Sequence, residues 1–232
     1  MNSREWLVNR LDENLSANER RSRIQKILVL GGGIDEPELM LFEKSGVEIH
    51  YAGIAQDSLD EKFHFIDLDN FTETDMTFDL VICNQVLEHL YNLESAFKYF
   101  DSLVCKNGMI WITCPANNFR HGSPFYYSAG YSREFLEMKL SHRGFVSIDV
   151  GELSSRRIYL FRHLLGLWPT TKQVRFPLIA YFGFNGTALQ KIAFNIKTIG
   201  SRIVIGFSSK RWEVNGNFPL ETYGFFEKKV DF

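Results

Sequence analysis

The chain has 232 residues, of which 45% are hydrophobic and 23% are charged, so it can form one large core and is neither a disordered nor a fibrous protein. The 26 Lys and Arg against 28 Asp and Glu give a net charge of −2, which excludes a strongly basic protein. These charges are unevenly distributed, because residues 1–150 carry 14 basic and 23 acidic side chains and residues 151–232 carry 12 and 5.

Short apolar runs alternate with segments of helical periodicity along most of the chain, a pattern typical of a parallel α/β sheet. Helices are predicted over residues 3–23, from about residue 36, after the fourth strand to about residue 104, and over 133–142. Strands are predicted over residues 26–30, 47–52, 62–66, 78–83, 109–113, 145–150 and 220–226. The pattern therefore predicts a Rossmann-like, seven-stranded, mostly parallel sheet with helices on both faces.

Residues 153–215 interrupt this alternation. Between residues 153 and 212 there are ten Lys and Arg and no acidic residue, and aromatic side chains lie between the basic ones. A helix is predicted to begin near Thr187 and to end at Gly200. We expect a helical insertion before the last strand, so that residues 1–232 form a single domain.

A glycine turn, Gly31-Gly-Gly33, follows the first predicted strand, where backbone N–H groups can approach a ligand. A dinucleotide fingerprint would need glycine at the position of Glu36, and the chain has no Gly-Lys-Ser/Thr phosphate loop. Asp35, Glu36 and Glu38 would repel a diphosphate, so a cofactor with a cationic centre and no phosphate fits better. A tight turn with a structural role is the alternative.

Two later motifs accompany this turn: Phe78-Asp-Leu-Val-Ile-Cys-Asn-Gln-Val-Leu-Glu-His-Leu90, and the segment 103–115 with its Lys-Asn-Gly turn and Pro115. Together with the turn they resemble the class I S-adenosylmethionine-dependent methyltransferases, in particular the small-molecule branch with a V-L-E-H motif. The resemblance covers about residues 26–150 and the last strand. The loop after the fifth strand also resembles those of methyltransferases associated with surface-polysaccharide biosynthesis.

The resemblance implies that S-adenosylmethionine is the cofactor and S-adenosylhomocysteine the product. It implies that the glycine turn binds the methionine part, that Asp67 accepts a hydrogen bond from the adenine amine, and that Asn84 and Gln85 lie near the methyl group. The predicted cofactor-binding residues are Leu30, Gly31, Gly32, Gly33, Asp35, Asp67, Leu68, Asn84 and Gln85.

Three positions depart from the family pattern. Val29 stands where an acidic residue usually precedes the glycines, Asp35 replaces the third glycine, and Ala55 replaces the acid that binds the ribose hydroxyls. Asp35 could contact the methionine amine, and Asp57 could replace the missing acid if its loop bends back. The departures leave open a second hypothesis, a degenerate methyltransferase fold that binds a partner through the basic insertion.

Methyl transfer to a hydroxyl needs a base near the ends of the fourth and fifth strands. His89 and His121 are the candidates, and His121 lies in a loop rich in turn residues. Glu88, Tyr126 and Tyr127 are predicted to bind substrate. Each also has a structural alternative: solvation for His121, helix capping for His89, orientation of a neighbour for Glu88, and packing under the loop for the tyrosines.

The basic insertion favours a small anionic substrate, such as a nucleotide-linked or lipid-linked sugar, over nucleic acid, because the acidic half would hinder binding of a polyanion. Contact with a membrane surface and oligomerisation through the insertion remain open. No metal is expected, because the three cysteines lack metal-ligand spacing. The sequence has neither a signal peptide nor an apolar run of about 18 residues, which predicts a cytoplasmic protein.

Overall fold

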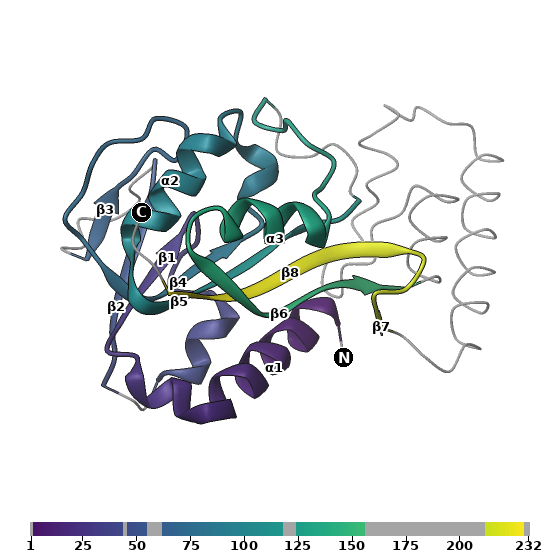
Figure 1. Ribbon diagram of the computed structural model, residues 1–232, viewed down its shortest axis with the longest axis horizontal. Coiled ribbons are helices and arrows are strands. Elements are labelled where there is room, and N and C mark those ends of the chain that lie inside the picture. The colour runs from purple at the N-terminus through teal and green to yellow at the C-terminus, as the bar shows by residue number, and fades with distance from the viewer. Residues whose placement is uncertain (1, 44–45, 55–61, 118–123, 156–211, 230–232) are drawn as a thin grey trace, which may run out of the picture. The chain divides into compact units, whose positions relative to one another are not determined.

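The computed structural model describes residues 2–43, 46–54, 62–117, 124–155 and 212–229 (Figure 1). Its helices are α1 (Ser3–Ser16), α2 (Leu93–Leu103) and α3 (Arg133–Ser141), with short 3-10 helices η1 (Ala17–Arg23), η2 (Pro37–Leu41) and η3 (Leu87–His89). Its strands are β1 (Lys26–Leu30), β2 (Glu48–Gly53), β3 (Phe63–Phe65), β4 (Phe78–Asn84), β5 (Val104–Pro115), β6 (Phe145–Ser154), β7 (Glu213–Val214) and β8 (Pro219–Lys228).

The strands form one sheet in the order β3-β2-β1-β4-β5-β8-β6-β7. The pairs β2–β3, β1–β2, β1–β4 and β4–β5 are parallel, whereas β8 runs antiparallel to β5. This arrangement confirms the predicted mixed α/β fold with a mostly parallel sheet. The sheet has eight strands instead of the predicted seven, because two residues of the predicted insertion form β7 against the end of β6.

The chain divides into two compact units. The first contains residues 3–152 and 221–232, and the second contains residues 153–220. In the described part of the second unit, Leu153 pairs with Val214 and the Ser154 hydroxyl donates to the Gly216 carbonyl at 3.0 Å. The helix predicted from Thr187 to Gly200 lies outside the described residues, and the single domain of residues 1–232 stays a prediction.

Helices cover both faces of the sheet in the first unit, with α1 on one face and α2 and α3 on the other (Figure 1). On the face of α2 and α3, Phe97 and Phe100 pack in the same buried cluster as Val81 and Ile110 of the sheet. Burial of these large side chains is the main favourable contribution to the stability of the fold.

The aromatic side chains of the other face belong to β5, β8 and α1. Trp111 of β5 is fully buried, and its ring lies 5.9 Å from that of Tyr223 and 6.3 Å from that of Phe225. Trp6 of α1 packs on Tyr223, with ring centroids 5.5 Å apart. These contacts attach α1 to the sheet through β8.

Two predicted helices are shorter than expected. The N-terminal helix ends at Ser16, and Asn18 and Glu19 have φ values of 54° and 55°, which an α-helix cannot contain. The helix expected from about residue 36 is only the 3-10 turn η2, which places Pro37 at its first position. The sequence periodicity does not reveal either interruption.

The segment after β4 is divided between η3 and α2. Asn92 caps α2, because its side chain accepts a hydrogen bond from the Ser95 N–H, and the α-helix therefore begins five residues after Glu88. Ser132 caps α3 in the same way by accepting from the Phe135 N–H, as its position in the sequence predicts.

A histidine pair joins β2 to β3. The His50 Nδ1 lies 2.8 Å from the His64 Nε2, Phe78 packs edge-on against both rings, and Glu48 lies 3.1 Å from the other side of His50. The two facing nitrogens hold one hydrogen between them, so the pair is stable with at most one positive charge. Burial is the main cause that lowers the pKa of His64, and the nearby His50 and Lys26 lower it further.

We expect this pair to destabilise the protein in acid. Between the lowered pKa of folded His64 and its ordinary value of 6.5, the unfolded chain binds a proton that the folded chain does not, so the free energy of unfolding falls as pH falls below 6.5. The slope for one proton is at most about 1.4 kcal/mol per pH unit. Urea unfolding measures the free energy of unfolding at pH 7.5 and at pH 5.5. The difference between the two values should be smaller for His64→Gln than for the wild type, and an equal difference would contradict the prediction.

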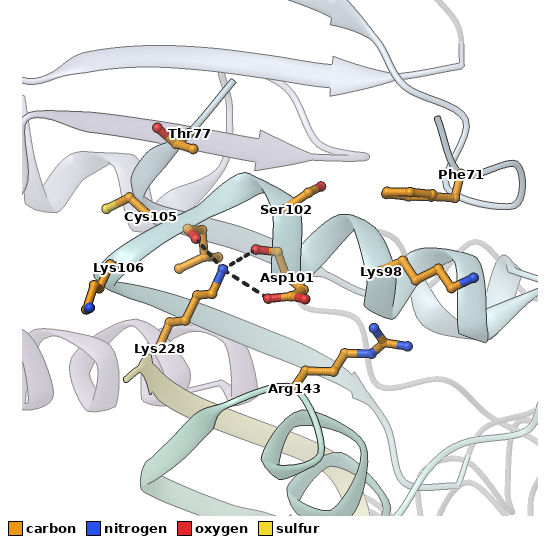
Figure 2. A pocket seen from close by; sticks show the side chains of 10 residues that line it. Phe71, Thr77, Lys98, Asp101, Ser102, Cys105, Lys106, Arg143 and Lys228 are labelled. Carbon is orange, nitrogen blue, oxygen red and sulfur yellow. Dashed lines mark hydrogen bonds and ion pairs between the residues drawn. The ribbon is translucent and has the colours of Figure 1, made fainter. Parts of the chain in front are cut away.

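A pocket of about 420 Å³ lies where α2 ends and β5 begins (Figure 2). Figure 2 shows Lys228 pointing toward Asp101, and its Nζ lies 2.9 Å from the Asp101 carboxylate and donates to the carbonyls of Asp101 and Val104 at 2.6 and 3.3 Å. Because a lysine stabilises the unpaired carbonyls at a helix C-terminus, we interpret Lys228 as a cap of α2. Lys98, Lys106 and Arg143 also line this pocket.

Among the described residues, no helix has both the length and the apolar character needed to cross a membrane.

Candidate active site

A cleft of about 540 Å³ lies at the carboxyl ends of β1, β2, β3 and β4, all in the first unit. Open α/β sheets bind ligands at this edge, beside the point where the strand order reverses. Here β1 lies between β2 and β4, so the chain leaves β1 in one direction for β2 and returns on its other side for β4. The cleft therefore occupies the position at which a ligand is expected in this topology.

Only one of the three turn glycines lines this cleft. Gly31 has φ of +69°, donates its N–H to the Ala52 carbonyl at 2.8 Å, and would place a Cβ 2.6 Å from a Val86 methyl group. A Cβ on Gly32 would meet the Glu36 carboxylate at 2.7 Å, whereas one on Gly33 would meet nothing within 4 Å. The structure thus requires glycine at position 31 for both backbone conformation and space.

The acidic side chains of the cleft follow β3. Asp67 accepts hydrogen bonds from the Asp69 N–H at 3.0 Å and from the Asn70 amide at 2.7 Å, which fixes the loop. Asp69 accepts from the Asn92 N–H at 2.7 Å and so connects this loop to the start of α2. None of the described residues that line the cleft is a lysine or arginine, so the lining is acidic.

Two residues with side-chain amides follow one another at the end of β4: Asn84 is its last residue, and Gln85 comes next. The Asn84 side chain donates to Glu36 at 3.1 Å and accepts from the buried Thr113 hydroxyl at 2.9 Å. Gln85 lines the cleft, has φ of +54°, and donates its side-chain N–H to Glu221 of β8 at 2.9 Å. Each amide is thereby held in one orientation by a carboxylate.

His89 lines the cleft at the end of η3, and its Nδ1 is hydrogen-bonded to the Phe125 carbonyl. Because a carbonyl only accepts, Nδ1 carries the hydrogen in the neutral ring, and Nε2 keeps the lone pair that a base requires. Tyr127 donates its N–H to the Glu88 carbonyl at 2.9 Å, so the segment after β5 lies along η3. Glu88 is fully buried, and its carboxylate lies 3.9 Å from the His89 Nε2.

Seven of the predicted site residues meet in the cleft, and the other six that lie in the described part of the chain do not line it. Asp35 is exposed, Asn84 and Glu88 are buried beside the cleft, and Tyr126 packs its ring edge-on against His89. His121 lies outside the described residues, so its role stays a prediction. The residues that meet there are Leu30, Gly31, Asp67, Leu68, Gln85, His89 and Tyr127. Those outside the lining are Gly32, Gly33, Asp35, Asn84, Glu88 and Tyr126.

Sequence reasoning missed an exposed apolar rim around the cleft. Ile54, Phe65, Tyr91 and Phe125 line it and are each more than half exposed. Together with Tyr127 they make up half of the exposed large hydrophobic residues in the described part of the chain. For Ile54 and Tyr91 the available signal was a position just after a strand or a 3-10 helix, and Phe65 is the last residue of β3. Such exposed patches commonly mark binding sites.

The departures from the family pattern have different structural consequences. Val29 is a buried residue of β1, two positions before the glycine turn. Asp35 points into solvent, and the carboxylate that folds back over the turn belongs to Glu36. Ala55 and Asp57 lie outside the described residues.

Metal-ligating side chains do not gather in the described ranges, where no group of three or more His, Cys, Asp or Glu could hold an ion. All three cysteines are free thiols. Burial raises the pKa of Cys83 and Cys114, which keeps these thiols protonated and inert.

Comparisons with known proteins agree with this architecture. Residues 42–112, which include Asp67, Gln85 and His89, match the family model described as a methyltransferase domain. No curated protein matches the chain.

Several solved structures share the fold at low sequence identity. A SAM-dependent methyltransferase from Archaeoglobus fulgidus has a TM-score of 0.54 at 16% identity, over 97% of this chain and 95% of that one. An O-methyltransferase of a Brevibacillus brevis polyketide synthase, in complex with S-adenosyl-L-homocysteine, has a TM-score of 0.52 at 16% identity, over 94% of this chain and 71% of that one. The [4+2]-cyclase SpnF has a TM-score of 0.54 at 16% identity, over 96% of this chain and 81% of that one. The shared fold therefore also serves other chemistry.

Residues 42–112 of this chain thus match a methyltransferase domain, within a Rossmann-like fold that the chain shares with solved methyltransferase structures.

Proposed function

We propose that the protein transfers a methyl group from S-adenosylmethionine to a hydroxyl or amine of a small substrate. The observation that carries this proposal is the cleft at the carboxyl ends of β1–β4, which combines the left-handed Gly31 turn with Asp67. The acidic lining suits a cofactor that carries a sulfonium and an ammonium. The methyltransferase-domain match and the cofactors named for structures of the same fold support the choice.

When bound, the cofactor supplies an activated methyl group, and the protein must orient it and remove a proton from the acceptor. Gly31, Asp67 and Gln85 would hold the cofactor, since they line the same cleft. We propose the His89 Nε2 as the base that takes the acceptor proton, because Nδ1 is hydrogen-bonded to the Phe125 carbonyl. His121 stays a second candidate for that role.

For the substrate, we propose an anionic sugar or glycan precursor of the kind used in surface-polysaccharide biosynthesis. Tyr127 and the neighbouring rim offer aromatic faces against which a sugar ring could pack, with Glu88 and Tyr126 behind them. The ten Lys and Arg of residues 153–212 favour an anionic substrate, such as one with a lipid-linked phosphate. We place the reaction in the cytoplasm, in keeping with three free cysteines.

Isothermal titration calorimetry with S-adenosylmethionine and S-adenosylhomocysteine tests the cofactor directly. The wild type should bind both, and Asp67→Ala should bind about tenfold or more weakly, because a hydrogen bond to a charged group contributes about 1.5–3 kcal/mol. Asp75→Ala, an exposed aspartate that does not line the cleft, is the matched control and should bind normally. A folded wild type that gives no heat at millimolar ligand would instead favour a degenerate fold that binds a partner.

A further inference from the structure

The pocket in Figure 2 lies at the opposite edge of the sheet from the candidate active site. Thr77 precedes β4 and Val104 begins β5, so this pocket lies at the amino ends of these parallel strands, whereas the cleft lies at the carboxyl end of β4. β8 runs antiparallel to β5 and contributes Lys228 from its carboxyl end. All the residues that line the pocket belong to the first unit. The pocket is therefore a separate cavity, which the proposed function does not use.

The charge of this pocket is opposite to that of the cleft. Its lining contains four basic side chains and one acidic side chain, which are Lys98, Lys106, Arg143, Lys228 and Asp101. The described lining of the cleft contains no lysine or arginine, and residues 1–150 as a whole carry 14 basic and 23 acidic side chains. Basic groups are thus concentrated in one cavity of an otherwise acidic part of the chain. A cavity of this kind attracts anions.

The single carboxylate of the lining is already neutralised. The Lys228 Nζ lies 2.9 Å from the Asp101 carboxylate, and the Lys228 side chain is only 7% exposed. These two opposite charges largely cancel for a ligand in the pocket. The positive potential inside the pocket therefore comes from the other three basic side chains.

The backbone holds Arg143 beside the pocket. The Arg143 N–H donates to the Leu140 carbonyl at 2.9 Å, which fixes the turn that follows α3. The Lys229 N–H donates to the Gly144 carbonyl at 2.9 Å, so this turn is attached to the end of β8 next to Lys228. Two segments that are far apart in the sequence thus bring their basic side chains to one cavity.

The partner of Arg143 leaves it able to bind a further anion. Its guanidinium contacts Glu94 of α2, and the same carboxylate lies 3.3 Å from the Lys139 Nζ. One carboxylate, on a side chain that is 54% exposed, is therefore shared by two cations. A guanidinium has five N–H donors, so Arg143 has more donors than this shared carboxylate requires.

The basic side chains are spread across the pocket. In Figure 2, Lys106 lies on one side of Lys228, and Arg143 and Lys98 lie on the other. The volume of about 420 Å³ falls within the range of about 300–1,000 Å³ that is usual for small-molecule sites. Guanidinium and ammonium groups are the usual protein partners of phosphate oxygens. We propose that this pocket binds a small anion that carries two or more phosphate groups.

Calorimetry of the full chain with inorganic pyrophosphate, in a buffer free of other phosphates, tests the inference. The wild type should bind pyrophosphate about fivefold or more tightly than orthophosphate, which reaches fewer of the basic groups. Arg143→Gln should lower the pyrophosphate affinity about tenfold or more, because it removes a charge-assisted hydrogen bond. The double variant Lys98→Gln/Lys106→Gln should lower this affinity about fivefold at an unchanged melting temperature, since both lysines are exposed.

Glu94→Gln should have the opposite effect and raise the pyrophosphate affinity about twofold to fivefold, because it frees the Arg143 guanidinium. Damage to the fold cannot produce such a gain. The matched control is Lys139→Gln, which removes a cation from the same carboxylate but does not line the pocket. It should bind pyrophosphate within about twofold of wild type.

Four outcomes would overturn the inference. They are a wild type that gives no heat with pyrophosphate, equal affinities for orthophosphate and pyrophosphate, unchanged affinity in both pocket variants, and an equal loss in Lys139→Gln. Unchanged affinity would mean that the anion binds elsewhere on the chain, and an equal loss in the control would mean a general attraction to the surface.

Two further titrations identify the source of the phosphate and separate this site from the cleft. Tighter binding of adenosine diphosphate than of pyrophosphate would indicate a nucleotide-type ligand, and weaker binding would indicate an inorganic one. Saturating S-adenosylhomocysteine should leave the pyrophosphate affinity unchanged, because the two cavities lie at opposite edges of the sheet. Displacement of pyrophosphate would instead assign the anion to the cleft and overturn the inference. A wild type that binds pyrophosphate but not S-adenosylhomocysteine would contradict only the proposed function.

Discussion

Replacing Trp111 with alanine should lower the free energy of unfolding by about 3–5 kcal/mol, the usual cost of deleting a large buried aromatic side chain. Trp111 is fully buried in β5, and its ring packs against Tyr223 and Phe225 of β8. The loss combines the hydrophobic contribution of the indole with the cavity left between the two strands. Urea unfolding followed by circular dichroism measures this change.

Phe65→Ala provides the comparison, because Phe65 is 73% exposed at the rim of the cleft. A surface substitution of this kind should change the free energy of unfolding by no more than about 0.5 kcal/mol. A loss below about 1 kcal/mol for Trp111→Ala would contradict the packing described between β5 and β8.

Gly31→Ala should weaken binding of S-adenosylhomocysteine at least tenfold and also destabilise the fold. The left-handed φ of +69° costs alanine about 1–2 kcal/mol, and its Cβ would lie 2.6 Å from a Val86 methyl group. Because both residues line the cleft, displacement of Val86 would change its shape. Calorimetry and thermal unfolding of the same samples measure the two effects.

Gly33→Ala is the control that shows whether the effect is specific to position 31 or whether any substitution in the glycine turn has it. A Cβ at position 33 meets no atom within 4 Å, and Gly33 does not line the cleft. We expect binding within about twofold of wild type and nearly unchanged stability. Comparable losses in the two variants would show that the whole turn, and not the Gly31 position, determines cofactor binding.

The sequence predicts the sheet well because each strand carries a local signal. The apolar runs at residues 26–30 and 78–83 form β1 and β4 almost to the residue, and Ser132 caps α3 as expected. The interruption at Asn18 and the shortness of η2 depend on backbone conformations that hydrophobic periodicity does not record. β7 is only two residues long and depends on its pairing with β6, so it has no local signal.

For the site, residues next to a motif could be predicted, but contacts between distant segments could not. Gly31 and Asp67 follow strands directly, and their place in the cleft follows from the topology. The link between Gln85 and Glu221 depends on β8 pairing beside β5, which no local pattern encodes. Glu36, and not Asp35, folds over the turn because η2 begins at Pro37 and leaves Asp35 in solvent.

The position of β8 also has a consequence for how the protein folds. Glu221 and Gln85 are separated by 136 residues in the chain, yet they must meet before the amide at the end of β4 acquires its orientation. Contacts of such long range form slowly, because the intervening chain loses much entropy when its ends are brought together. During synthesis, β1 to β5 emerge well before β8. We therefore expect the orientation of the Gln85 side chain to be fixed in one of the last steps of folding.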